Sequence, residues 1–145
     1  MTTLFDIAQN WLNQDPDAET HAEITALLTA AKNGDEKAHA DLQARFSDRL
    51  QFGTAGLRGP LQAGPMGMNR VLVAQAAGGL ADYLKDYDKQ PSIVIGYDGR
   101  KNSDVFARDT AEIMAGAGVK AYLLPRKLPT PVLAYAIQYL SLIHI

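Results

Sequence analysis

Apolar side chains recur at helical spacing through residues 1–50 and predict a helical N-terminal segment. A first amphipathic helix is expected from its apolar residues Leu4, Phe5, Ala8, Trp11 and Leu12. Thr20 and Glu23 have the spacing of a capping box, so we expect a second helix to start there and to end at Gly34. A third helix is expected from Asp35 to about residue 50, with an inward face of Ala38, Leu42 and Phe46.

After residue 50 the pattern changes, because glycines separate helical stretches from short apolar runs. Asn69 can cap a helix that runs through Val71, Leu72, Ala76, Leu80, Tyr83 and Leu84. Residues 92–97 and 119–124 are rich in β-branched and apolar side chains and predict two strands. Between them we expect a helix, capped by Asn102 or Ser103, with an inward face of Phe106, Thr110, Ile113 and Met114. With a further helix after Pro129, the alternation favours an α/β fold with a parallel or mixed sheet.

Composition limits the classes of protein that these elements can form. The 145 residues are 47% hydrophobic, carry a formal charge of -2 and include no cysteine. A chain of this size can bury a core, and its charge gives no global field that would collect nucleic acid or an anionic membrane. Cysteine nucleophiles, disulfides and cysteine metal sites are excluded. With no apolar stretch long enough for a membrane span, we expect a cytoplasmic protein.

Residues 51–65, QFGTAGLRGPLQAGP, are the first stretch with candidate chemistry. Gly53, Gly56 and Gly59 follow a spacing that matches neither the dinucleotide-binding fingerprint nor the P-loop. Thr54 offers a hydroxyl, and Arg58 offers a planar fork of donors that suits a phosphate group. The same residues would also form an ordinary turn with a surface arginine, and spacing alone does not separate the two interpretations.

A second candidate is GYDGR, residues 96–100, at the carboxyl end of the first predicted strand, where open α/β sheets place ligand-binding loops. Arg100 could bind an anion there, and we treat it as a secondary candidate. Alternatively, Asp98 could pair with Arg100 and hold the loop in shape.

Metal-binding and acyl-transfer motifs are weak or absent. Asp15 and Asp17 alternate as hard oxygen ligands do, but they lead into a helix whose N-terminus favours acidic residues. The three histidines, His21, His39 and His144, have no partner at zinc-binding spacing. No serine lies in a G-x-S-x-G motif.

Four segments together resemble the first domain of the α-D-phosphohexomutases: FGTAGLRG at 52–59, GPMGMNR at 64–70, IGYDGR at 95–100 and LPTPVLAYAI at 128–137. The sequence is most similar to the bacterial phosphoglucomutase and phosphopentomutase branch. The resemblance implies a three-layer α/β/α domain with a mixed, mainly parallel sheet, preceded by a helical segment. It divides the chain into residues 1–50, an incomplete domain I at 51–140, and a tail at 141–145 that does not match the family.

The family resemblance implies transfer of phosphate between C1 and C6 of a hexose, or C1 and C5 of a pentose. The transfer uses a phosphoserine, a sugar bisphosphate and Mg²⁺. By the same resemblance, Thr54, Gly56 and Arg58 belong to the loop that borders the catalytic serine, with Arg58 stabilising the phosphate.

The family's Thr-x-Ser-His-Asn-Pro motif does not occur in this sequence, nor does its aspartate-rich magnesium loop. We therefore expect no catalytic residue and no metal ligand here, and an inactive N-terminal fragment whose natural partner is the rest of a mutase chain. A truncated or mis-joined reading frame would account for the terminal SLIHI. The alternatives are a non-catalytic module that binds phosphosugar or phosphate, and a purely structural α/β fragment.

Overall fold

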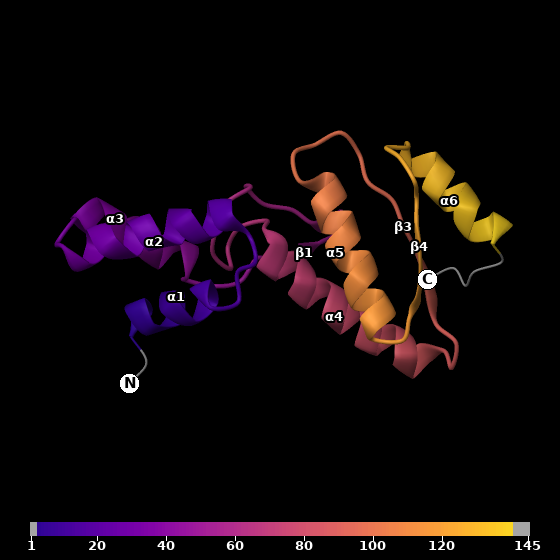
Figure 1. Cartoon of the computed structure of the whole chain (residues 1–145), viewed down its shortest axis with the longest axis horizontal. Helices are drawn as coiled ribbons and strands as arrows, with labels where there is room; N and C mark the ends of the chain where they lie inside the picture. Colours follow the sequence, from indigo (N-terminus) through magenta and orange to yellow (C-terminus); the bar gives the residue numbers. More distant parts are fainter. Residues whose placement is uncertain (1–2, 141–145) are drawn as a thin grey trace. The chain divides into compact units, whose positions relative to one another are not determined.

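The computed structural model describes residues 3–140 and divides the chain into two compact units, Met1–Leu72 and Val73–Ile145 (Figure 1). The first contains α1 (Leu4–Leu12), α2 (Ala18–Lys32), α3 (Glu36–Arg45), β1 (Phe52–Gly53), β2 (Gly56–Leu57) and the start of α4 (Arg70–Tyr87). The second contains most of α4, then β3 (Ser92–Ile95), α5 (Ser103–Gly116), β4 (Lys120–Leu123) and α6 (Thr130–Tyr139). The predicted tail at 141–145 lies outside the described residues.

The helices of the first unit bear out the hydrophobic pattern. Their buried side chains form one core with two residues of the later loop and helix: Ala8, Trp11, Leu12, Ile24, Leu28, Leu42, Ala63 and Val71. The Trp11 ring meets the edge of Phe46 at a centroid distance of 6.2 Å. Because Ala63 and Val71 belong to this core, the segment that follows the hairpin packs against the helices rather than lying free on their surface.

Two predictions for this unit were wrong in detail. The second helix begins at Ala18, and its N-cap is Asp17, whose side chain accepts a hydrogen bond from the Glu19 amide at 2.9 Å. Thr20 lies inside that helix, and its hydroxyl donates to Asp15 Oδ2 at 2.6 Å, so the Thr20–Glu23 capping box does not form. The third helix ends at Arg45, before residue 50, and Phe46 is its C-cap.

The second unit has a layered α/β arrangement. Strands β3 and β4 pair in parallel, with Ser92 opposite Lys120 and Ile95 opposite Leu123. Helices α4 and α5 cover one face of this pair through Ala77, Ala81, Leu84 and Met114, and α6 lies on the other side (Figure 1). These three layers confirm the predicted α/β/α fold class. Within residues 3–140 this sheet consists of the two strands β3 and β4, and they are parallel.

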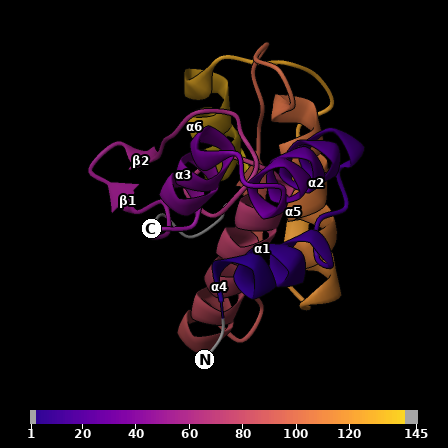
Figure 2. The same cartoon turned by 90° about the vertical axis from the view of Figure 1, so that its left-hand side faces the viewer.

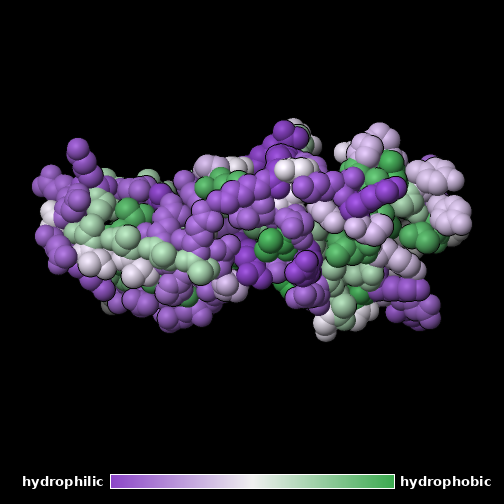
Figure 3. Space-filling model, turned by 45° about the horizontal axis from the view of Figure 1, so that its top comes forward, coloured by the Kyte–Doolittle hydropathy of each residue, from purple (hydrophilic) through white to green (hydrophobic). Residues whose placement is uncertain are grey.

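The helices of this unit bury small side chains and leave several large ones exposed. Leu80 and Tyr83 of α4 are 42% and 52% exposed, whereas the small residues Ala77 and Ala81 point into the core. Asn102 precedes α5 in a left-handed conformation and makes no side-chain capping bond. Large exposed apolar side chains are concentrated in this unit, at Leu80, Tyr83, Tyr87, Leu123, Val132, Tyr135, Tyr139 and Leu140, and hydrophobic residues reach its surface in Figure 3.

Candidate functional site

Thr54, Gly56 and Arg58 are brought together on one small antiparallel hairpin, residues 52–59, hereafter the hairpin (Figure 2). Phe52 pairs with Leu57 and Gly53 with Gly56, so the tip of the turn is Thr54 and Ala55. Gly56 has φ +92°, a left-handed conformation that disfavours any side chain. The sequence predicted a turn here, and the structure adds the strand pairing.

The hairpin faces solvent. Every residue from 52 to 59 is exposed except Leu57, which is partly buried. The guanidinium of Arg58 donates through Nε to the Ala55 carbonyl at 3.2 Å, which draws the side chain back along the turn. Within residues 3–140 no carboxylate pairs with Arg58, so its remaining donors are available to an anion.

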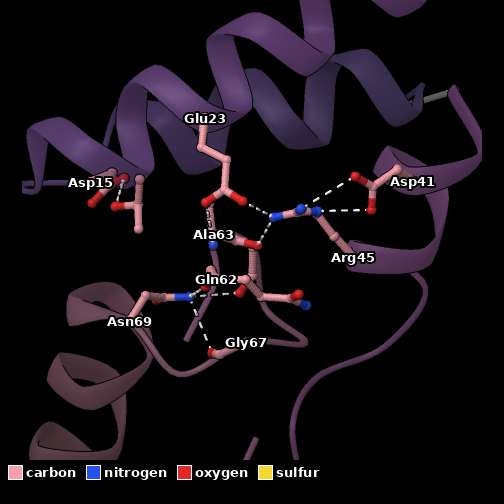
Figure 4. A network of polar contacts seen from close by, with 10 residues as sticks. Asp15, Glu23, Asp41, Arg45, Gln62, Ala63, Gly67 and Asn69 are labelled. Carbon is pink, nitrogen blue, oxygen red and sulfur yellow. Dashed lines mark hydrogen bonds and ion pairs between the residues drawn. The ribbon is translucent and has the colours of Figure 1, made fainter. Parts of the chain in front are cut away.

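The segment after the hairpin, residues 62–69, contains only buried and partly buried residues, and we call it the clamped loop. Asn69, only 2% exposed, donates from Nδ2 to the carbonyls of Gln62, Gly64 and Gly67 at 2.8–3.1 Å. Its Oδ1 accepts the Leu72 amide at 3.0 Å, so the predicted cap of α4 is confirmed. One buried side chain thus closes the loop and starts the helix (Figure 4).

An ion pair between two helices holds the clamped loop from the other side. Glu23 of α2 binds Arg45 Nη1 at 2.6 Å through one carboxylate oxygen and accepts the Ala63 amide at 3.0 Å through the other (Figure 4). Arg45 also donates to both oxygens of Asp41 at 3.0 and 3.2 Å and to the Ala63 carbonyl at 3.4 Å. Burial alone would lower the pKa of Arg45, but the hydrogen bonds to Asp41 and Glu23 raise it above its usual value.

Sequence reasoning missed this network. Glu23 and Arg45 stand on different helices and face a loop amide 40 residues from Glu23, so no helical periodicity relates them. The signal that existed was misassigned, because the Thr20–Glu23 spacing favoured a capping box.

Arg100 belongs to the second unit and is engaged within its own loop. Its guanidinium donates to Asp98 Oδ2 at 2.7 and 2.8 Å, and its backbone amide donates to Asp98 Oδ1 at 3.0 Å. The Arg100 side chain and backbone hydrogen bonds lower the pKa of Asp98 from 3.8 to about 2. The structure therefore shows the pairing that the sequence left as an alternative, while a ligand role for Arg100 stays a prediction.

The described residues do not fit a bound magnesium ion. Between residues 3 and 140, no group of three histidine or acidic side chains could hold a metal. Asp15 accepts the Asp17 amide and the Thr20 hydroxyl, and Asp17 caps α2, so both acids have helix-entry roles. His39 packs its ring edge-on against Phe5, whereas His144 lies outside the described residues.

Within residues 3–140, no helix is both long and apolar enough to cross a membrane.

Comparison with known proteins decides the family. Residues 49–144 match the family model described as phosphoglucomutase/phosphomannomutase, α/β/α domain I. This chain belongs to the α-D-phosphohexomutases. Its match to domain I includes the hairpin, the clamped loop and the whole second unit up to residue 140.

Named phosphohexomutase relatives extend the similarity. The chain is 95% identical over 74 residues to a probable phosphomannomutase of Haemophilus influenzae, covering 51% of the chain and 15% of the relative. It is 44% identical over 96 residues to a Staphylococcus haemolyticus phosphoglucomutase, covering 66% and 18%. It is 40% identical over 135 residues to a Saccharomyces cerevisiae phosphoribomutase, covering 90% and 21%.

These matches also bear on the helical segment before residue 49. A match to yeast phosphoribomutase over 90% of the chain necessarily includes most of that segment, which the family model leaves out. The chain spans about a fifth or less of the length of these three relatives. No solved structure gives a significant match.

Proposed function

We propose that this chain provides the first-domain phosphate contact of a phosphosugar mutase, and that the hairpin makes that contact. The observation that carries the proposal is the exposed guanidinium of Arg58, which pairs with no carboxylate within residues 3–140 and stands on a glycine hairpin of the matched domain. Support comes from the relatives, whose names are phosphomannomutase, phosphoglucomutase and phosphoribomutase. The substrate class is accordingly a hexose or pentose monophosphate, and its bisphosphate is the activator.

The chemistry of the hairpin suits the binding of a transferring phosphoryl group. Arginine presents parallel N–H donors that match two phosphate oxygens, and its charge offsets the negative charge that spreads over them during transfer. Thr54 adds a hydroxyl at the tip of the same turn. Gly56 keeps the backbone between them free of a side chain, so an anion can approach closely.

These residues bind and orient, but none of them is a nucleophile for phosphoryl transfer. A phosphoserine would supply that step, and the Ser-His-Asn-Pro motif does not occur in this sequence. Between residues 3 and 140 there is also no group of three acidic or histidine side chains that could hold a metal ion. We therefore propose that the 145-residue chain binds phosphosugar without turning it over.

Calorimetric titration of the chain with glucose 1-phosphate tests the binding. We expect Arg58→Ala to raise the Kd about tenfold, because it removes a charge-assisted contact worth about 1.4 kcal/mol. Arg49→Ala is the matched control, since it removes the same charge from an exposed arginine near the hairpin. Equal weakening by both variants would reduce the effect to general electrostatic attraction and defeat the proposal.

A coupled assay tests the absence of turnover. Conversion of glucose 1-phosphate to glucose 6-phosphate is followed with magnesium and glucose 1,6-bisphosphate present. We expect no rate above the protein-free blank. Measurable turnover that scales with the concentration of the purified chain would contradict this part of the proposal.

A further inference from the structure

The hairpin is tied to the rest of its unit mainly through its two ends. On the side before β1, the Leu50 amide donates to the Pro65 carbonyl at 2.9 Å. On the side after β2, the Met68 amide donates to the Pro60 carbonyl at 2.8 Å, and Leu61 and Met68 form a parallel bridge. Both ends are therefore fastened to the clamped loop and its neighbours, while residues between them face solvent.

The two flanks of the hairpin also touch each other closely. A β-carbon added to Gly59 would come within 2.8 Å of Leu50 Cδ2. The nearest atoms are the methyl groups of Leu50, so the segment that leaves the hairpin packs closely against the side chain of the residue that leads into it. A displacement of the clamped loop would consequently be passed to the hairpin through both flanks.

The position of the clamped loop depends in turn on Glu23 and Arg45. Glu23 accepts the Ala63 amide, and Ala63 is completely buried, so this carboxylate satisfies a backbone donor that water cannot reach. The carbonyl of Arg45 accepts the Met66 amide at 3.2 Å, and Gly64, with φ +96°, lies close enough that a β-carbon would meet Arg45 Cβ at 3.1 Å. The charged side chains thus hold the loop at Ala63, whereas the backbone and Cβ of Arg45 hold it at Met66 and Gly64.

We propose that Glu23 and Arg45 are positioning residues for phosphosugar binding, which act on the hairpin through the clamped loop. They do not touch the ligand themselves. The helical segment ahead of the matched domain thereby acquires a role in the site, because one member of the pair comes from α2 and the other from α3. The inference rests on the proposed function for its ligand, although the mechanical coupling can be measured without one.

The test compares Glu23→Gln with Ile24→Val in the 145-residue chain. Glutamine keeps an oxygen for the Ala63 amide but places an uncharged amide against Arg45, so the link between the helices is broken. Ile24 is fully buried in the same core and adjacent on α2, so its loss of one methyl group lowers stability without changing the ion pair. Arg45→Lys is the second variant, because lysine keeps the charge but cannot reach Glu23, Asp41 and the Ala63 carbonyl together.

Two measurements are made on each variant, both referred to the folded fraction. Hydrogen exchange reports the amides of Leu50, Met66 and Met68 relative to the slowest helical amides. NMR titration with glucose 1-phosphate reports the Kd and the chemical-shift changes of the Gly53 and Gly56 amides. We expect Glu23→Gln and Arg45→Lys to speed exchange at the three amides about tenfold, and to raise the Kd about fivefold. Ile24→Val should leave both ratios unchanged.

The outcomes separate this inference from the proposed function. The positioning role would be overturned if Glu23→Gln and Arg45→Lys both kept the wild-type exchange rates and affinity. It would also be overturned if Ile24→Val had equal effects, even if Arg58→Ala still weakens binding. If the wild-type chain does not bind glucose 1-phosphate, the proposed function fails, and selective exchange at the three amides still decides whether the clamp positions the hairpin. If Glu23→Gln unfolds, Arg45→Lys decides the same two points.

Discussion

The hairpin, residues 52–59, and the clamped loop, residues 62–69, are neighbouring segments of equal length, and both are rich in glycine. The hairpin has three glycines and is exposed almost throughout, whereas the loop has two and buries Ala63, Gly64, Gly67 and Asn69. The difference comes from side chains outside the glycine pattern. Asn69 gathers three loop carbonyls, and Glu23 takes the Ala63 amide, while the hairpin relies on its own two-residue strands.

Glycine spacing indicates where the backbone is free to turn, but it does not indicate whether the turning segment is buried or exposed. In the loop, the buried amides of Ala63 and Gly67 and the buried carbonyls of Ala63, Gly64 and Gly67 find hydrogen-bond partners within the protein. In the hairpin, solvent can satisfy the backbone, so the segment stays available to a ligand. Substitutions that attack the loop should therefore cost stability, and those in the hairpin should cost binding.

The largest expected effect is at Asn69. Asn69→Asp replaces the donors that face three carbonyl oxygens with a buried negative charge, and we expect a loss of about 3 kcal/mol in the free energy of unfolding. Urea denaturation measures it. Asn10→Asp, the same change at an exposed helical position, should stay within about 0.5 kcal/mol. A loss at Asn69 no larger than this control would mean that the loop is held elsewhere.

A smaller effect separates the glycines of the two segments. A β-carbon at Gly67 would lie 2.3 Å from the Gln62 carbonyl oxygen, which is backbone and cannot move aside alone. We expect Gly67→Ala to destabilise the protein by about 2 kcal/mol in thermal or urea unfolding. At Gly53 the nearest atom would be 3.7 Å away, so Gly53→Ala should change stability by less than about 0.5 kcal/mol. Equal losses would contradict the contrast between the segments.

The smallest effect concerns an exposed ion pair, in contrast to the partly buried pair of Arg45 and Glu23. The Arg100 side chain is 87% exposed, against 13% for Arg45. Because folding lowers the pKa of Asp98, the pair stabilises the protein above pH 3.8, and this contribution is lost as the pH falls toward 2.

Arg100→Gln removes the first cause of that shift, so the pKa of Asp98 should rise from about 2 toward 3.8. Carbon-13 NMR titration of the carboxyl group measures the change directly. Arg126→Gln, at another exposed arginine of the same unit, should leave the Asp98 titration where it was. An unchanged titration in Arg100→Gln would show that the backbone amide and Ser103 alone hold the carboxylate.

Local rules predicted the elements well where one chemical signal acts over a few residues. The first helix, the Asn69 cap and the two parallel strands follow from spacing and β-branched content. The errors occurred where two local signals competed. Asp17, rather than Thr20, caps α2, because its side chain accepts the Glu19 amide. The Thr20 hydroxyl instead donates to Asp15.

The candidate site was likewise predictable only in part from the sequence. The sequence indicated the family, and the comparisons confirm it, whereas a phosphate-binding role for Thr54, Gly56 and Arg58 stays a prediction. It also gave both readings of Arg100, and the structure shows the pairing with Asp98. No sequence spacing could connect Glu23 with Ala63, because the contact forms only when α2 packs beside a loop that follows three further elements.

The amino-acid sequence by itself therefore determined the family and the alternation of helices and strands, and it supplied the residues that we propose bind phosphate. These depend on residue type and short spacing, which are properties of the chain alone. Only the tertiary structure decided which glycine-containing segment is exposed and which is buried. It also decided that Glu23, paired with Arg45, accepts the Ala63 amide of the buried segment. The reason is physical: a buried amide must find a partner, and the partner that reaches it is fixed by packing between distant segments.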